Sequence, residues 1–146
     1  MPQLLPRGSR TLLDTNVLVY LFDRRSPKKA HQAQALIAEA LDTGRGIISY
    51  QVVQEFLNVA RRKFLDVLTA REAELFLHRV LWPLCDVLPD MQLYATALSI
   101  ADETGWTFYD SLIVSSAARA GCSLLFSEDL QAGRVVRGVE IQNPFE

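Results

Sequence analysis

Short apolar runs alternate with longer amphipathic stretches along this chain. The runs at 11–13, 46–49, 84–88 and 122–126 have the length and composition of buried strands. Between them, apolar residues recur at spacings of three and four, which predicts helices at 16–22, 27–43, 50–63, 70–82, 90–104 and 109–120. A last short run at 139–142 predicts a fifth strand at the edge of the sheet.

Residues that cap helices stand at several of the predicted ends. The predicted N-terminal signals are Ser26 before Pro27, Ser49, and Thr69 with Glu72 in the pattern of a capping box. Gly44 and Gly105 predict helix ends, because glycine readily adopts the left-handed conformation found there. Pro83 predicts the end of the helix that begins after Thr69.

The alternation of strands and helices predicts an α/β fold with three layers. Crossover helices between strands favour a mostly parallel sheet, here of four to five strands, with helices on both faces. Residues 1–9 contain Pro2, Pro6 and Gly8 and are predicted to be a loose N-terminal leader. Residues 10–146 are predicted to form a single domain, since 146 residues is an ordinary length for one domain.

Composition and charge narrow the classes of function. Hydrophobic residues make up 49% of the chain and charged residues 22%, which is typical of a globular protein. The net charge is −2, so nucleic-acid binding would require a local basic patch. No transmembrane helix or signal peptide is predicted, and no membrane partner is expected. Cys85 and Cys122 read as buried thiols of a reducing compartment, which favours a cytoplasmic location.

Acidic residues stand where the predicted elements change. Asp14 and Asp129 follow strands, whereas Glu55 and Asp110 lie in the first turns of helices. Taken singly, each has an ordinary explanation, as a helix cap, a solvated helix residue or a turn former. Taken together, all four can meet at one rim of a parallel sheet, in the crevice where ligands bind in open α/β folds.

Carboxylates gathered in this way point to a divalent metal. Without a cation they would repel one another and raise one another's pKa values. Hard oxygen ligands select Mg²⁺ or Mn²⁺ over Zn²⁺. Mg²⁺ is usually completed by water and substrate phosphates, which indicates phosphodiester chemistry with one or two ions.

The same residues lie in motifs that resemble the PIN-domain signature. The motifs are Leu-Leu-Asp14-Thr-Asn16-Val-Leu-Val, Val-Val-Gln-Glu55-Phe, Tyr-Asp110-Ser-Leu-Ile-Val-Ser-Ser-Ala and Leu-Leu-Phe-Ser-Glu-Asp129-Leu. Their order and spacing are similar to those of small VapC-like toxins across nearly the whole chain. The resemblance implies a Mg²⁺- or Mn²⁺-dependent endoribonuclease in which Asp14, Glu55, Asp110 and Asp129 are both the catalytic residues and the metal ligands. It further implies that Asn16, Ser49 and Ser127 line the site, and that the partners are an RNA substrate, a cognate antitoxin and a second copy of the chain.

Several alternatives stay open at this stage. Glu128 stands beside Asp129 and is an alternative fourth acid. An aspartyl-phosphate phosphatase is disfavoured, because Asn16 and Leu18 replace the Asp and Thr of the Asp-x-Asp-x-Thr motif. A nuclease-inactive PIN-like module that binds a protein or RNA is the alternative of a different class. Two basic clusters are either RNA contacts or solvated helix ends: Arg24, Arg25, Lys28 and Lys29, and Arg61, Arg62 and Lys63.

Overall fold

The computed structural model describes residues 4–146, which build a six-stranded sheet with the order β3-β2-β1-β4-β6-β5. The strands are β1 (Arg10–Leu13), β2 (Gly46–Ser49), β3 (Cys85–Val87), β4 (Cys122–Phe126), β5 (Val135–Val136) and β6 (Val139–Gln142). All neighbours pair in parallel except β5 and β6, which pair antiparallel. The α/β class and the mostly parallel sheet are therefore confirmed.

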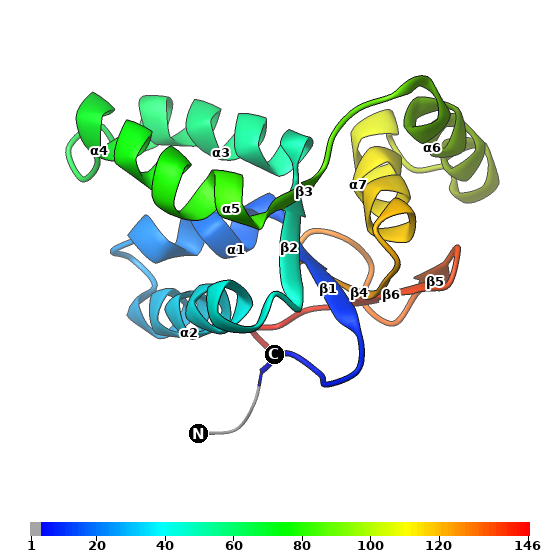
Figure 1. Cartoon of the computed structure of the whole chain (residues 1–146), viewed down its shortest axis with the longest axis horizontal. Helices are drawn as coiled ribbons and strands as arrows, with labels where there is room; N and C mark the ends of the chain where they lie inside the picture. The colour runs from blue at the N-terminus through cyan, green and yellow to red at the C-terminus, as the bar shows by residue number, and fades with distance from the viewer. Residues whose placement is uncertain (1–3) are drawn as a thin grey trace.

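Helices cover both sides of this sheet, as Figure 1 shows. On one side lie α6 (Met91–Thr104) and α7 (Phe108–Arg119). The other side is formed by α1 (Thr15–Val19), the 3₁₀ turn η1 (Tyr20–Phe22), α2 (Pro27–Thr43), α3 (Tyr50–Lys63) and α4 (Ala70–Phe76). None of the helices within residues 4–146 is long and apolar enough to cross a membrane.

Two details of the sheet and helices differ from the sequence predictions. The predicted edge strand, β6, lies inside the sheet, because the unpredicted two-residue strand β5 folds back on it as a short hairpin. The helix after Thr69 does not end before Pro83: a π turn, η2 (Leu77–Leu81), leads into α5 (Trp82–Leu84). Proline is tolerated there because it occupies the first turn of α5, where a backbone N–H is not needed.

Most of the predicted caps form, although the side chain of Ser26 makes no capping hydrogen bond at the start of α2. Ser49 accepts a hydrogen bond from the Val52 N–H, and Thr69 and Glu72 form a complete capping box. Gly44 and Gly105 end α2 and α6 in the left-handed conformation. These local signals fix where the helices begin and end, and so which side chains stand at the sheet rim.

Part of the predicted leader packs onto the domain. Residues 1–3 lie outside the described part of the chain. Leu5 is fully buried in the core, and the Leu4 and Leu5 N–H groups donate to the carboxylate of Glu39 on α2. The division into a leader at 1–9 and a domain at 10–146 stays a prediction.

The order of the strands places the expected ligand-binding crevice beside β1. The chain runs from β1 to β2 on one side, then crosses to β4 on the other side, so the direction of winding reverses between β1 and β4. In open α/β sheets, ligands bind outside the carboxyl ends of the strands at such a point. Asp14 follows β1 directly, and Ser127 follows β4.

Candidate functional site

Asp14 lies at the carboxyl end of β1 and caps α1. One carboxylate oxygen accepts a hydrogen bond from the Thr15 N–H at 2.7 Å, and the other accepts from the Ser127 hydroxyl at 2.7 Å. Burial raises the pKa of Asp14 to about 6, although both hydrogen bonds act in the opposite direction. Glu55 and Asp129 raise it further by charge repulsion, so Asp14 lies in the field of two other acids.

Glu55 faces the same crevice from the middle of α3. Its carboxylate accepts a hydrogen bond at 2.9 Å from the Thr15 hydroxyl, which stands next to Asp14 in the chain. Desolvation raises the pKa of Glu55, and repulsion from Asp110 and Asp129 adds to this shift. The residue as a whole is exposed.

Asp110 lies in the first turn of α7, where the Thr107 hydroxyl accepts a hydrogen bond from its N–H at 3.1 Å. The preceding carbonyl, that of Tyr109, accepts a hydrogen bond at 3.1 Å from the side chain of Gln51 on α3. Gln51 is 4% exposed and lies one helical turn before Glu55. It therefore ties the start of α7 to the helix that carries Glu55.

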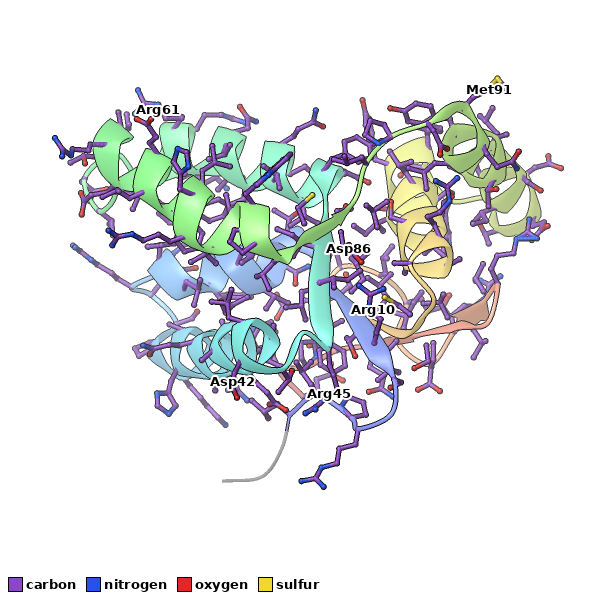
Figure 2. The ribbon with its side chains drawn as sticks, viewed as in Figure 1. Arg10, Asp42, Arg45, Arg61, Asp86 and Met91 are labelled. Carbon is purple, nitrogen blue, oxygen red and sulfur yellow. The ribbon has the colours of Figure 1, made fainter. Side chains whose placement is uncertain are left out.

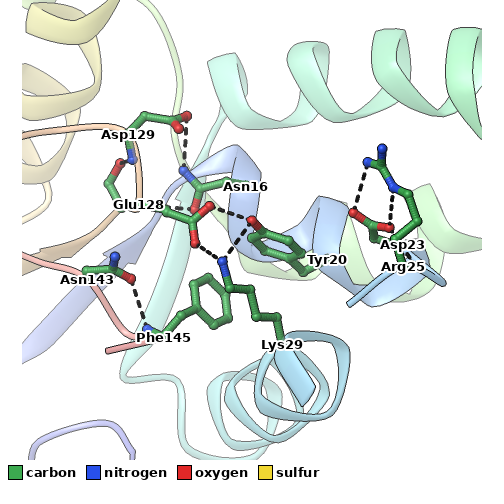
Figure 3. A network of polar contacts seen from close by, with 10 residues as sticks. Asn16, Tyr20, Asp23, Arg25, Lys29, Glu128, Asp129, Asn143 and Phe145 are labelled. Atoms are coloured by element: carbon green, nitrogen blue, oxygen red, sulfur yellow. Dashed lines mark hydrogen bonds and ion pairs between the residues drawn. The ribbon is translucent and has the colours of Figure 1, made fainter. Parts of the chain in front are cut away.

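The loop after β4 brings Asp129 to the crevice. The Ser127 hydroxyl, which donates to Asp14, also accepts from the N–H groups of Asp129 and Leu130 at 3.2 and 3.3 Å. The Asn16 side chain donates to the Asp129 carboxylate at 3.3 Å (Figure 3). Ser127 and Asn16 thus connect Asp129 to the segment that contains Asp14.

Glu128 has a different set of partners from Asp129. Its carboxylate accepts hydrogen bonds from the Tyr20 hydroxyl and, at 2.6 Å, from the Lys29 ammonium group (Figure 3). Lys29 belongs to one of the two basic clusters considered as RNA contacts, and here it forms an ion pair within the protein. Only Asp129 of these two acids adds to the repulsion at Asp14 and Glu55.

The donors around this crevice suit a hard divalent cation. They are carboxylate, hydroxyl and amide oxygens, and the contacts described above include no His or Cys. Repulsion among Asp14, Glu55, Asp110 and Asp129 is the electrostatic signature of a site that a cation would relieve. Within residues 4–146, no three Asp, Glu, His or Cys side chains lie close enough together to hold one ion as they stand. Mg²⁺ commonly needs only one or two protein carboxylates besides water and substrate phosphates, so the donor set fits such an ion.

Three further polar residues belong to this region. Ser49 is fully buried, and its side chain caps α3. Sequence reasoning missed Thr15 and Gln51, which contact the predicted acidic segments. Thr15 lies inside the Asp14 motif and Gln51 lies four residues before Glu55, so helical spacing offered a signal for Gln51.

Comparison with known proteins identifies the family. The model of the PIN domain matches residues 11–138, so this chain belongs to the PIN-domain family. PIN domains are generally nucleases, and such nucleases generally use divalent metals. No curated protein sequence shows a significant match to the chain.

Solved structures with a similar fold include chains of two DNA-bound complexes. One is FitAB bound to the IR36 DNA fragment, with 21% identity and a TM-score of 0.60 over 93% of this chain and 96% of that chain. The other is VapBC2 from Rickettsia felis bound to a DNA fragment from its promoter, with 15% identity and a TM-score of 0.58 over 91% and 97%. At these identities the likeness shows the fold.

Proposed function

We propose that this protein is a Mg²⁺- or Mn²⁺-dependent endoribonuclease that hydrolyses RNA phosphodiester bonds. The observation that carries the proposal is that hydrogen bonds connect the four segments bearing Asp14, Glu55, Asp110 and Asp129 beside the carboxyl end of β1. These acids come from four separate segments of a chain in the PIN-domain family.

Each side chain has a stated role in this proposal. Asp14 and Asp110 are the principal metal ligands, and Glu55 and Asp129 complete the cluster directly or through water. A bound ion would supply an activated water and stabilise negative charge on the phosphate. Three neighbours orient the carboxylates: Ser127 holds Asp14, Thr15 holds Glu55 and Asn16 holds Asp129.

The nuclease proposal is tested by incubating purified protein with a labelled pool of total RNA in EDTA, Mg²⁺ or Mn²⁺. We expect discrete fragments that require the metal and are lost in Asp14→Asn. Asp42→Asn is the matched control, because Asp42 is exposed on α2, away from the crevice (Figure 2). No cleavage with any metal, together with retained binding of RNA or a protein, would favour the inactive binding module instead.

We further propose that the protein is the toxin of a toxin–antitoxin pair and acts in the cytoplasm. The fold similarity to chains of FitAB and VapBC2 supports the pairing, and the free thiols of Cys85 and Cys122 suit a reducing compartment. A basic antitoxin side chain would be attracted to the acidic crevice. Co-expression with the product of the neighbouring gene should yield a stable complex with reduced nuclease activity, and a fully active chain that ignores that product would contradict this role.

A homodimer is part of the same proposal. Leu88, Met91 and Leu98 are 58%, 84% and 61% exposed at and just before α6, and Met91 projects outward from the start of this helix in Figure 2. Such large apolar side chains favour an interface. Light scattering should give twice the mass of one chain, and Met91→Glu with Leu98→Glu should reduce it to that of a monomer.

A further inference from the structure

The carboxylate of Glu128 is held on both oxygens by residues far from it in sequence. Its Oε2 accepts from the Lys29 Nζ at 2.6 Å across a separation of 99 residues, and its Oε1 accepts from the Tyr20 hydroxyl. Lys29 Nζ also donates to the Tyr20 hydroxyl at 3.3 Å. We call Tyr20, Lys29 and Glu128 the Glu128 network (Figure 3).

Aromatic rings shield this network from water. Lys29 Nζ lies 4.9 Å from the centroid of the Tyr20 ring and 5.8 Å from that of Phe145. The two rings pack edge to face at 4.9 Å. The side chains of Lys29 and Glu128 are only 37% and 25% exposed, so their attraction is screened less than that of a fully exposed pair.

The Glu128 network is linked to the acidic crevice through Asn16. The Glu128 N–H donates to the side-chain oxygen of Asn16 at 3.4 Å, and the side-chain nitrogen of Asn16 donates to Asp129 at 3.3 Å. Both ends of the Asn16 amide are therefore used between Glu128 and Asp129. A movement of Glu128 would carry the Asp129 backbone with it, because the two residues are adjacent.

The charges of the network keep Glu128 out of the crevice. Lys29 and Tyr20 together engage both oxygens of the Glu128 carboxylate, which directs it toward α2 and η1. The hydrogen bond to Glu128 also raises the pKa of Lys29, so the ammonium group stays charged. Without Lys29, Glu128 would be an uncompensated negative charge next to the four acids of the crevice.

We infer that Lys29 and Glu128 are positioning residues, which hold the loop after β4 so that Asp129, and not Glu128, faces the metal. This inference rests on the proposed function of the same crevice. Under this inference Lys29 pairs with Glu128 and does not contact an RNA phosphate, and Asp129 is the fourth acid of the cluster.

The test is Mn²⁺ binding measured by calorimetry without RNA. Lys29→Met removes the ammonium group and keeps the length of the side chain. By simple electrostatics, removing a positive charge near an acidic site would tighten Mn²⁺ binding. We expect the opposite, a loss of affinity of about 10- to 100-fold, because changes to the partners of metal ligands typically have that effect.

Two further variants separate positioning from a general effect on folding. Lys29→Arg keeps the ion pair and should restore most of the affinity. Tyr20→Phe changes no charge, keeps the ring against Phe145, and should weaken Mn²⁺ binding less than Lys29→Met. Lys28→Met, at the exposed neighbouring position on α2, is the matched control and should bind Mn²⁺ like the wild type.

Kinetics provide a second readout. At saturating Mn²⁺, Lys29→Met should lower kcat and leave KM for RNA unchanged, whereas loss of a phosphate contact would raise KM. Equal or tighter Mn²⁺ binding by Lys29→Met, or an equal loss in Lys28→Met, would overturn the inference and leave the proposed function standing. A wild-type protein that neither binds Mn²⁺ nor cleaves RNA would overturn both.

Discussion

Asp14 combines a structural and a chemical role in one carboxylate. As the N-cap of α1 it accepts from the Thr15 N–H, and it also accepts from the buried Ser127 hydroxyl. Burial raises the pKa of Asp14, and repulsion from Glu55 and Asp129 adds a smaller contribution, so its ionised form is unfavourable without a cation. Residues kept for function often cost stability in this manner.

The first prediction concerns the stability of Asp14→Asn without metal. The amide keeps an oxygen for the Thr15 N–H and removes the charge that burial, Glu55 and Asp129 disfavour. The melting temperature in EDTA at pH 7.5 should therefore rise above that of the wild type, while RNA cleavage is lost. Asp42→Asn should leave both properties unchanged, and a lower melting temperature for Asp14→Asn would contradict this account.

The second prediction concerns how the stability that Asp90 contributes depends on pH. It caps α6 by accepting from the Leu93 N–H at 2.8 Å, and it pairs with Arg119 of α7 at 2.6 and 2.8 Å. The hydrogen bond from Arg119, followed by that from Leu93, lowers the pKa of Asp90 from 3.8 to about 2. Because the folded-state value is depressed, the stabilisation is present above pH 3.8 and is lost as the pH falls through about 2.

Substitution of Asp90 separates these two contacts. Asp90→Ser keeps a helix-capping side chain and loses the ion pair, whereas Asp90→Ala loses both. Acid unfolding followed by circular dichroism should show the stability difference between the wild type and Asp90→Ser shrinking between pH 4 and pH 2. Asp90→Ala should be less stable than Asp90→Ser throughout, and a constant difference across the acid range would contradict the assigned pKa shift.

At the scale of elements, Gly46 sets how closely α2 lies against β2. A Cβ atom at Gly46 would stand 2.6 Å from the Cβ of Ala40 and 3.1 Å from a methyl carbon of Leu5. Both neighbours belong to the core, and Ala40 is 1% exposed. The contact therefore requires small residues on both the strand and the helix.

Gly46→Ala should accordingly destabilise the protein by about 1–3 kcal/mol, the usual range for overpacking a core. Ala40→Gly alone should also be destabilising, by about 1 kcal/mol, because glycine disfavours the helix. The double variant should be more stable than the sum of the two single effects predicts, since the glycine at 40 makes room for the new methyl group. Urea unfolding of all four proteins measures this coupling, and strict additivity would contradict the proposed contact.

The sequence predicted where helices and strands lie along the chain better than it predicted which of them lie side by side in the fold. Helix ends followed from local chemistry, as at Ser49 and Thr69, where the cap and its partner lie within three residues. The position of β6 inside the sheet could not be predicted in this way, because its neighbour β5 has only two residues and no recognisable hydrophobic pattern. The strand ends predicted that Asp14 and Asp129 stand at the same edge of the sheet, where Ser127 and Asn16 connect their segments. The Lys29–Glu128 pair, by contrast, joins residues 99 apart and depends on how α2 packs.

At the scale of the whole molecule, metal binding should stabilise the fold. A ligand that binds only the folded state at 100 times its Kd adds about 2.7 kcal/mol to the free energy of unfolding. The melting temperature of the wild type should rise with Mn²⁺ concentration, and that of Asp14→Asn should rise much less. Buffer without Mn²⁺, with NaCl added to the same ionic strength, is the control. An equal rise of the melting temperature in both proteins would mean that the ion binds away from Asp14.

The long separation between the two sides of the crevice has a consequence for the timing of folding. Asp14 and Ser127, whose side chains meet, are 113 residues apart, and they meet only when β4 pairs with β1. Contacts that close such long loops form slowly, and a chain emerging during synthesis lacks the second partner until Ser127 has been made. The crevice therefore cannot assemble on a nascent chain before β4 has emerged, and any cutting activity would begin only after that point.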